Sequence, residues 1–87
     1  MKMSIRKTDS QALDALRFDE VLLRLRRGVG DIVVEGTTSI PEADVMLCRY
    51  KGKRFNIKFD LDYGVCIEAI DGLSGEDLRD LVRLLTR

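Results

Sequence analysis

Apolar and polar residues alternate over residues 54–61, a pattern that predicts a strand with one buried side. The apolar side carries Phe55, Ile57, Phe59 and Leu61. Lys51-Gly52 is a two-residue hairpin loop, because glycine supplies the positive φ that such a turn needs. Pairing across this loop sets Tyr50 opposite Lys53, Cys48 opposite Phe55 and Met46 opposite Ile57. Met46 and Cys48 therefore join the apolar side, since directly opposed residues share a face.

A second turn is predicted at Asp62-Tyr63-Gly64, with Gly64 as a left-handed bulge residue. This turn predicts a register with three apolar pairs on the buried side and one opposite-charge pair on the other side. The pairs are Leu61 with Val65, Phe59 with Ile67, Ile57 with Ala69, and Lys58 with Glu68. The two turns thus give residues 43–70 one consistent apolar face across three strands.

Residues 10–27 are predicted to form a helix, capped by Asp9 or Ser10. Its apolar stripe has helical spacing and consists of Ala15, Phe18, Val21, Leu22 and Leu25. Residues 22–27, "LLRLRR", also alternate, so a strand from Val21 onward is the competing interpretation. Residues 31–35 are expected to be a short strand between two glycines, and residues 36–44 a loop with room for one helical turn after Pro41.

The C-terminal segment carries the signals of a helix start. Ser74 is the predicted N-cap, Asp77 stands at the third helical position, and Leu73 with Leu78 can form a hydrophobic staple. The apolar stripe that follows is Leu78, Leu81, Val82 and Leu85. We therefore predict an α+β fold in the order α-β-β-β-β-α: an N-terminal helix, a short strand, a three-strand antiparallel meander and a C-terminal helix. Both helices are expected to lie on one face of the sheet.

A chain of 87 residues with 45% hydrophobic and 34% charged residues is typical of one small globular domain. Residues 1–9 are expected to be flexible. The N-terminus has no apolar stretch after its basic residues, so no signal peptide is predicted, and no stretch is long enough for a membrane span. With two cysteines and no secretory signal, the chain is expected to be cytoplasmic with reduced thiols.

Charge is unevenly distributed although its sum is zero. Five basic residues and no acid occur in residues 49–58, namely Arg49, Lys51, Lys53, Arg54 and Lys58. Residues 60–80 carry seven acids against one base, Arg79. Such an asymmetry either solvates the surface or recognises a charged partner.

Catalytic chemistry finds little support in the sequence. The segment "IKFDLDYGV" resembles the nucleophile strand of haloacid-dehalogenase-type phosphatases, in which a strand ends in D-x-D. Only 25 residues follow Asp62, however, too few for the doubly wound sheet of that family. Asp60 and Asp62 are therefore interpreted as turn residues. Histidine is absent, Gly28-Val29-Gly30 lacks a third glycine, and no enzyme, cofactor or metal site is predicted.

Nucleic-acid binding is the alternative function. The order helix, three strands, helix resembles that of double-stranded-RNA-binding domains, whose second helix begins with basic residues that contact phosphates. Here that helix begins "GEDLRD", and its acids would repel a phosphate backbone. The basic hairpin tip, Arg49–Arg54, remains a candidate for phosphate contacts.

A protein partner is the preferred expectation. If both helices cover the Phe55 side, the opposite side of the sheet is open and shows mixed charges around apolar side chains, a composition suited to a protein interface. With the adjacent hairpin tip, the predicted partner-binding residues are Val45, Leu47, Arg49, Lys51, Lys53, Arg54, Asn56, Lys58 and Glu68. We predict a small non-enzymatic interaction module, such as an inhibitor, immunity protein or adaptor, with a homodimer as one form of the contact and no membrane association.

Overall fold

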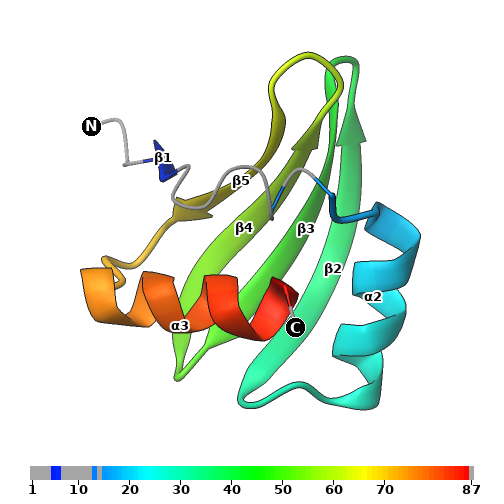
Figure 1. The fold of residues 1–87 in the computed structure, drawn as a ribbon. Helices are drawn as coiled ribbons and strands as arrows, with labels where there is room; N and C mark the ends of the chain where they lie inside the picture. Colours follow the sequence, from blue (N-terminus) through cyan, green and yellow to red (C-terminus); the bar gives the residue numbers. More distant parts are fainter. Residues whose placement is uncertain (1–4, 7–12, 14, 87) are drawn as a thin grey trace.

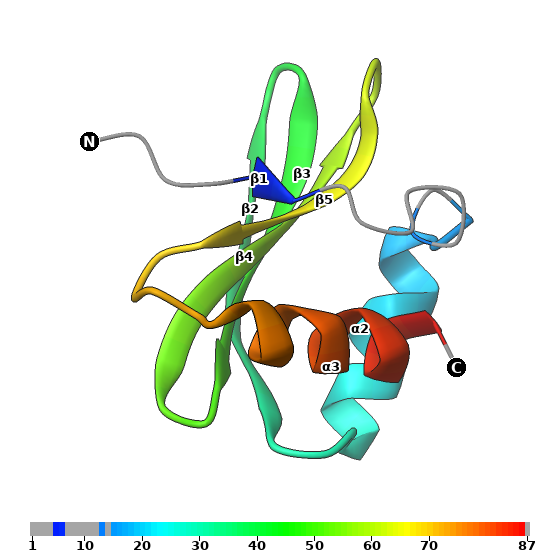
Figure 2. The ribbon, with the colours of Figure 1, turned by 60° about the vertical axis from the view of Figure 1, so that its left-hand side comes forward.

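The computed structural model describes residues 5, 6, 13 and 15–86, and it has the predicted α+β class. One antiparallel sheet carries both helices on the same face (Figures 1 and 2). The helices are α2 (Phe18–Arg27) and α3 (Gly75–Thr86). The strands are β1 (Ile5–Arg6), β2 (Ile32–Ile40), β3 (Ala43–Tyr50), β4 (Lys53–Asp60) and β5 (Gly64–Ala69).

The sheet has the strand order β1-β5-β4-β3-β2. The predicted meander forms its centre, and β2 extends it at one edge by pairing antiparallel with β3. At the other edge the two-residue β1 pairs with Ile67 and Glu68 of β5. Residues 5 and 6, expected to be flexible, thus lie in a strand, and the rest of that N-terminal prediction falls outside the described residues.

The prediction of a loop over residues 36–44 was wrong. β2 continues to Ile40, and the chain reverses through Pro41 and Glu42 directly into β3. The register shifts between Val34 and Gly36, which is a β-bulge. The sequence pattern predicts that the strand ends before Gly36, whereas glycine inside a strand often marks a bulge. Pairing with the strongly apolar β3 then holds the polar stretch Thr37-Thr38-Ser39 extended.

The first hairpin has the predicted register. Tyr50 lies opposite Lys53, Cys48 opposite Phe55 and Met46 opposite Ile57. Lys51 and Gly52 both have positive φ, 52° and 80°, as a type I′ turn requires. The Cys48 and Phe55 side chains are at most 1% exposed, so this face is the buried one.

The second hairpin keeps the predicted faces but not the predicted pairs. Phe59 lies opposite Val65, Ile57 opposite Ile67, and Lys58 opposite Cys66 instead of Glu68. The loop is Leu61–Tyr63, because the Asp60 carboxylate accepts hydrogen bonds from the Asp62 and Tyr63 amides (2.8 and 3.0 Å) and closes the turn one residue earlier. A shift by two positions preserves the faces, since side chains alternate with period two. Leu61, predicted to be apolar core, is 81% exposed in this loop.

Gly64 has the left-handed conformation that its turn predicts, with φ of 83°. We expect Gly64→Val to destabilise the fold by about 1 kcal/mol or more, because a β-branched residue resists positive φ. Gly64→Asn is the matched control and should cost less, since asparagine tolerates this region. Thermal unfolding of both variants checks the prediction, and an equal loss for the two would contradict a backbone origin.

The predicted N-terminal helix is interrupted, because Leu13 is helical whereas Ala15, Leu16 and Arg17 are not. Within the described residues α2 begins at Phe18, Arg17 is extended, and Ala15 is exposed instead of lying on the apolar stripe. The proposed caps Asp9 and Ser10 lie outside the described residues. Leu13 is 0% exposed, and a straight helix would place it about 140° around the axis from Phe18. A break before Phe18 therefore lets Leu13 and α2 enter the same core.

The C-terminal helix begins as predicted. The Ser74 hydroxyl accepts a hydrogen bond from the Asp77 amide (3.0 Å), and Leu73 and Leu78 are both buried. At the other end of α3 the Arg24 guanidinium donates to the carbonyl oxygens of Leu84 and Leu85 (3.0 and 2.8 Å). A cation at this position complements the negative end of the helix dipole, so it ties α2 to α3.

The core lies between the helices and the inner face of the sheet. Its fully buried side chains include Met46, Phe55, Ile57, Ile67, Leu81 and Leu85, together with Leu13 and Val21. Phe59 is only partly buried and meets Phe18 edge to face, with ring centroids 5.2 Å apart. Neither α2 nor α3 is long and apolar enough to span a membrane.

Candidate functional site

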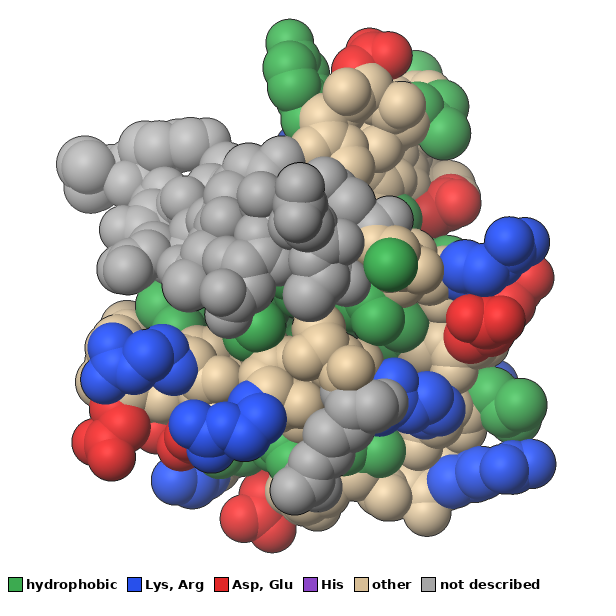
Figure 3. Space-filling view, viewed as in Figure 1, with side chains coloured by type: hydrophobic (Ala, Val, Ile, Leu, Met, Phe, Trp, Pro, Cys, Tyr) green, Lys and Arg blue, Asp and Glu red, His purple; other side chains and the backbone are tan. Residues whose placement is uncertain are grey.

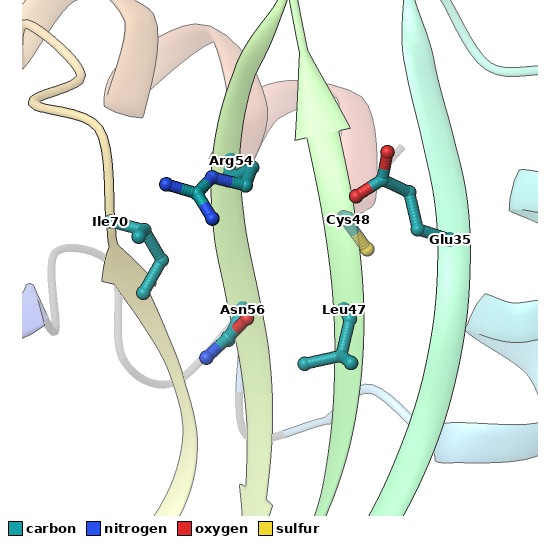
Figure 4. Close-up of a pocket in the computed structure, with 6 residues that line it drawn as sticks. All are labelled: Glu35, Leu47, Cys48, Arg54, Asn56 and Ile70. Atoms are coloured by element: carbon teal, nitrogen blue, oxygen red, sulfur yellow. The ribbon is translucent and has the colours of Figure 1, made fainter.

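The outer face of the sheet, defined as the face turned away from α2 and α3, is the candidate site. Side chains alternate along each strand, so β3 presents Leu47 and Arg49 there, and β4 presents Arg54 and Asn56. Ile70 follows β5 on the same side. A hollow of about 290 Å³ opens between them (Figure 4). It is lined by Glu35, Leu47, Cys48, Arg54, Asn56 and Ile70.

Apolar side chains on this face are unusually accessible. Leu47 is 37% exposed and Ile70 41% exposed, and they stand on either side of Asn56 in Figure 4. Val33 of β2, opposite Arg49 in the ladder, is 55% exposed. Leu47 and Val33 lie on paired strands and Ile70 directly follows one, so this surface loses little conformational freedom on contact.

The basic side chains of this face are already paired within the chain. Arg49 donates from Nε to the Glu35 carboxylate (2.8 Å). The Arg54 guanidinium donates from Nε and Nη2 to the two carboxylate oxygens of Asp71 (3.0 and 2.9 Å). The Arg54 backbone amide donates to the same carboxylate (2.9 Å). These hydrogen bonds to Arg54 lower the pKa of Asp71 to about 2. Because both guanidinium groups already pair with carboxylates of this chain, they are less available to an acidic partner than the sequence alone suggests.

Asp71 provides a test of this pairing. Its pKa is lower in the folded chain than its ordinary value of 3.8, so the pair stabilises the fold fully above about pH 4 and loses that contribution as pH falls toward about 2. In a carboxyl-detected NMR titration we expect the Asp71 midpoint near 2, and Arg54→Gln should move it toward 3.8. If the Asp71 midpoint were the same in wild type and in Arg54→Gln, the Arg54–Asp71 ion pair would not persist in solution.

The structure brings some of the predicted partner-binding residues together and separates others. Leu47, Arg49, Arg54 and Asn56 surround the hollow or adjoin it, and the half-buried Lys58 and Glu68 lie further along the same face. Lys51 and Lys53 belong to the hairpin end on the helix side, where Lys51 lies 3.8 Å from the Asp77 carboxylate.

Val45, a predicted partner-binding residue, is buried, and so is Cys66. Val45 and Cys66 are each 7% exposed although they lie on the outer side of the ladder. Both are short and flank Lys58, which stands opposite each of them on the neighbouring strand. A short side chain beside longer ones is shielded even where no helix covers the sheet. Near the hollow the accessible apolar side chains are therefore Leu47 and Ile70, with Val33 next to Arg49, and Ile40 is accessible at the far end of the face.

Sequence reasoning missed three residues of this face: Val33, Glu35 and Asp71. Val33 and Glu35 lie on β2, whose pairing with β3 was not predicted. The bulge at Glu35 and Gly36 changes the alternation of faces within β2, so a simple period-two pattern misplaces the residues after it. Asp71 lies 17 residues from Arg54, and no local pattern links them.

Asp60 ends β4 and Asp62 lies in the loop that follows it, the turn positions predicted for this carboxylate pair. One carboxylate oxygen of Asp60 accepts hydrogen bonds from the Asp62 and Tyr63 amides, and Asp62 is exposed in the loop. Within residues 15–86, no group of three or more aspartates, glutamates and cysteines is arranged to hold a metal ion.

Neither cysteine forms a disulfide, and both are buried. Burial, reinforced by the charge of Glu35, raises the pKa of Cys48 to about 12. The Cys48 thiol, which lies in the core on the inner side of the sheet, is therefore protonated at neutral pH and is a poor nucleophile.

No protein-family model matches this chain, and neither the curated proteins nor the solved structures contain a match. The sheet also departs from the resemblance to double-stranded-RNA-binding domains noted above, because β2 adds a fourth long strand to the three of the meander.

Proposed function

We propose that this chain is a small, non-enzymatic protein-interaction module that acts in the cytoplasm and binds a protein partner through the outer face of its sheet. The observation that carries the proposal is the uncovered hollow on that face, with Leu47 and Ile70 accessible at its sides. An inhibitor, an immunity protein or an adaptor would act in this way, by occupying a surface of its target.

The chemistry of the hollow favours a partner that inserts an apolar side chain. Leu47 and Ile70 offer apolar walls, and Asn56 between them offers an amide that can donate and accept. The ion pairs of Arg49 and Arg54 lie at the edge, where charges contribute orientation more than affinity. An apolar centre with a polar rim is the usual composition of a protein interface.

Phosphate binding by the basic hairpin tip is the alternative that this geometry disfavours. Arg49, Lys51 and Arg54 each have an acidic side chain within ion-pair distance. A polyanion would have to compete with these intramolecular carboxylates, and the acidic start of α3 lies beside Lys51.

The test uses two single substitutions in the hollow and one matched control. Leu47→Asp and Ile70→Asp place a charge in the apolar walls, whereas Leu23→Asp places the same charge at a 55% exposed position on α2. Proteins captured from the native host by wild type should be identified by mass spectrometry and should be lost with the first two variants only. Binding should persist at high salt, because an apolar contact is screened little.

Circular dichroism establishes that each variant is folded, and analytical ultracentrifugation reports whether a second copy is the partner. If all three variants keep the wild-type mass and the wild-type set of captured proteins, the outer face is only a solvated surface and the proposal is wrong.

A further inference from the structure

The end of the sheet farthest from α3 carries an apolar tip, which we define as Ile40, Pro41, Leu61 and Tyr63 (Figure 1). Leu61 is 81% exposed and Tyr63 75% exposed, the two highest values among the exposed large apolar side chains. Ile40 of the neighbouring turn is 39% exposed and Pro41 is also exposed. None of these residues lines the hollow of the outer face, so the apolar tip is a separate surface.

The apolar tip is held by hydrogen bonds within and between its two turns. The Leu61 amide donates to the Glu42 carbonyl oxygen (3.0 Å), which joins the β4–β5 loop to the β2–β3 turn. The Asp60 carboxylate holds the Asp62 and Tyr63 amides, and the Ser39 hydroxyl donates to Asp44 (2.5 Å). Exposed apolar side chains on a braced loop are therefore presented in a set arrangement instead of packing onto the core.

The two turns that form the apolar tip are acidic. Residues 40–44 and 60–64 contain four acids and no base, namely Glu42, Asp44, Asp60 and Asp62. In Figure 3 acidic and hydrophobic side chains stand together at this end of the molecule. The acids disfavour nucleic acid and anionic lipid, and a two-fold contact between copies would set acid against acid.

We propose that the apolar tip docks into an apolar cleft with a basic rim on a partner protein. Tyr63 and Leu61 are the side chains that would enter the cleft, since an accessible aromatic residue beside an aliphatic one is a common energetic centre of interfaces. The exposed acids Glu42, Asp44 and Asp62 would then meet lysine or arginine side chains at its edge. Together with the outer face, this gives the chain two separate contact surfaces.

The experiment titrates the full ¹⁵N-labelled chain with three synthetic peptides of equal length as probes. One alternates lysine with leucine, one lysine with serine, and one glutamate with leucine. We expect the lysine–leucine peptide to shift the amide signals of residues 40–44 and 60–64, and the other two to bind at least about tenfold more weakly, because each lacks half of the required chemistry.

Two variants sharpen the test. Leu61→Ser with Tyr63→Ser should weaken binding of the lysine–leucine peptide at least about tenfold, whereas Leu47→Asp should leave it unchanged and so separates this site from the outer face. Signals that shift mainly elsewhere, equal binding of the glutamate–leucine peptide, or binding of the tip to anionic lipid vesicles would each overturn the proposal. Concentration-dependent association that the double serine variant abolishes would assign the surface to a second copy and overturn it too.

Discussion

Replacing Phe55 by alanine should destabilise the fold by about 3–5 kcal/mol. Phe55 is 0% exposed and stands on β4, between Cys48 of β3 and Ala69 of β5, so its ring fills the centre of the core. Small domains have total stabilities of about 5–15 kcal/mol, and this loss should leave the variant partly unfolded near room temperature. Urea unfolding followed by circular dichroism measures the difference.

Two controls separate burial from position on β4. Phe59→Ala should cost less, about 1–3 kcal/mol, because Phe59 is only half-buried beside the core, where its ring meets Phe18 edge to face. Lys58→Ala, on the outer face, should change stability by less than about 1 kcal/mol. Equal losses for Phe55→Ala and Lys58→Ala would mean that the two faces of the sheet are wrongly assigned.

Leu81→Ala is the second large expected effect, with a loss of about 2–5 kcal/mol. Leu81 lies in the middle of α3, is 0% exposed, and belongs to the same core cluster as Phe55 and Val21. Removing its side chain leaves a cavity where α3 meets the sheet, and the surrounding side chains can close it only in part.

Leu23→Ala is the matched control, since it makes the same change within a helix at a position that is 55% exposed. Helix propensity changes equally in both variants, so their difference isolates burial. We expect less than about 0.5 kcal/mol for Leu23→Ala in the same urea titration. A comparable loss at both positions would place α3 away from the core.

The candidate site was predictable only in outline. The alternation of Leu47, Arg49, Arg54 and Asn56 with core residues placed them correctly on the outer face. The charges of Arg49 and Arg54 are neutralised by Glu35 and Asp71, respectively. Glu35 reaches Arg49 because β2 pairs with β3, and Asp71 reaches Arg54 because the chain turns after β5. The apolar tip could not be predicted either. Leu61 fits the apolar alternation of β4 in the sequence, but in the structure it lies in the exposed loop after that strand.

The sequence by itself determined the α+β class, the first hairpin register, the inner and outer faces of β3 to β5, and the start of α3. Each of these depends on interactions within a few residues: glycine at Lys51-Gly52, a cap at Ser74, and period-two alternation. Tertiary structure decided the length of β2, the exact pairs of β4 with β5, and the break before Phe18. Those features depend on the packing of the whole core and on hydrogen bonds between turns, such as the one from the Leu61 amide to the Glu42 carbonyl oxygen. Such long-range interactions leave no local pattern in the chain.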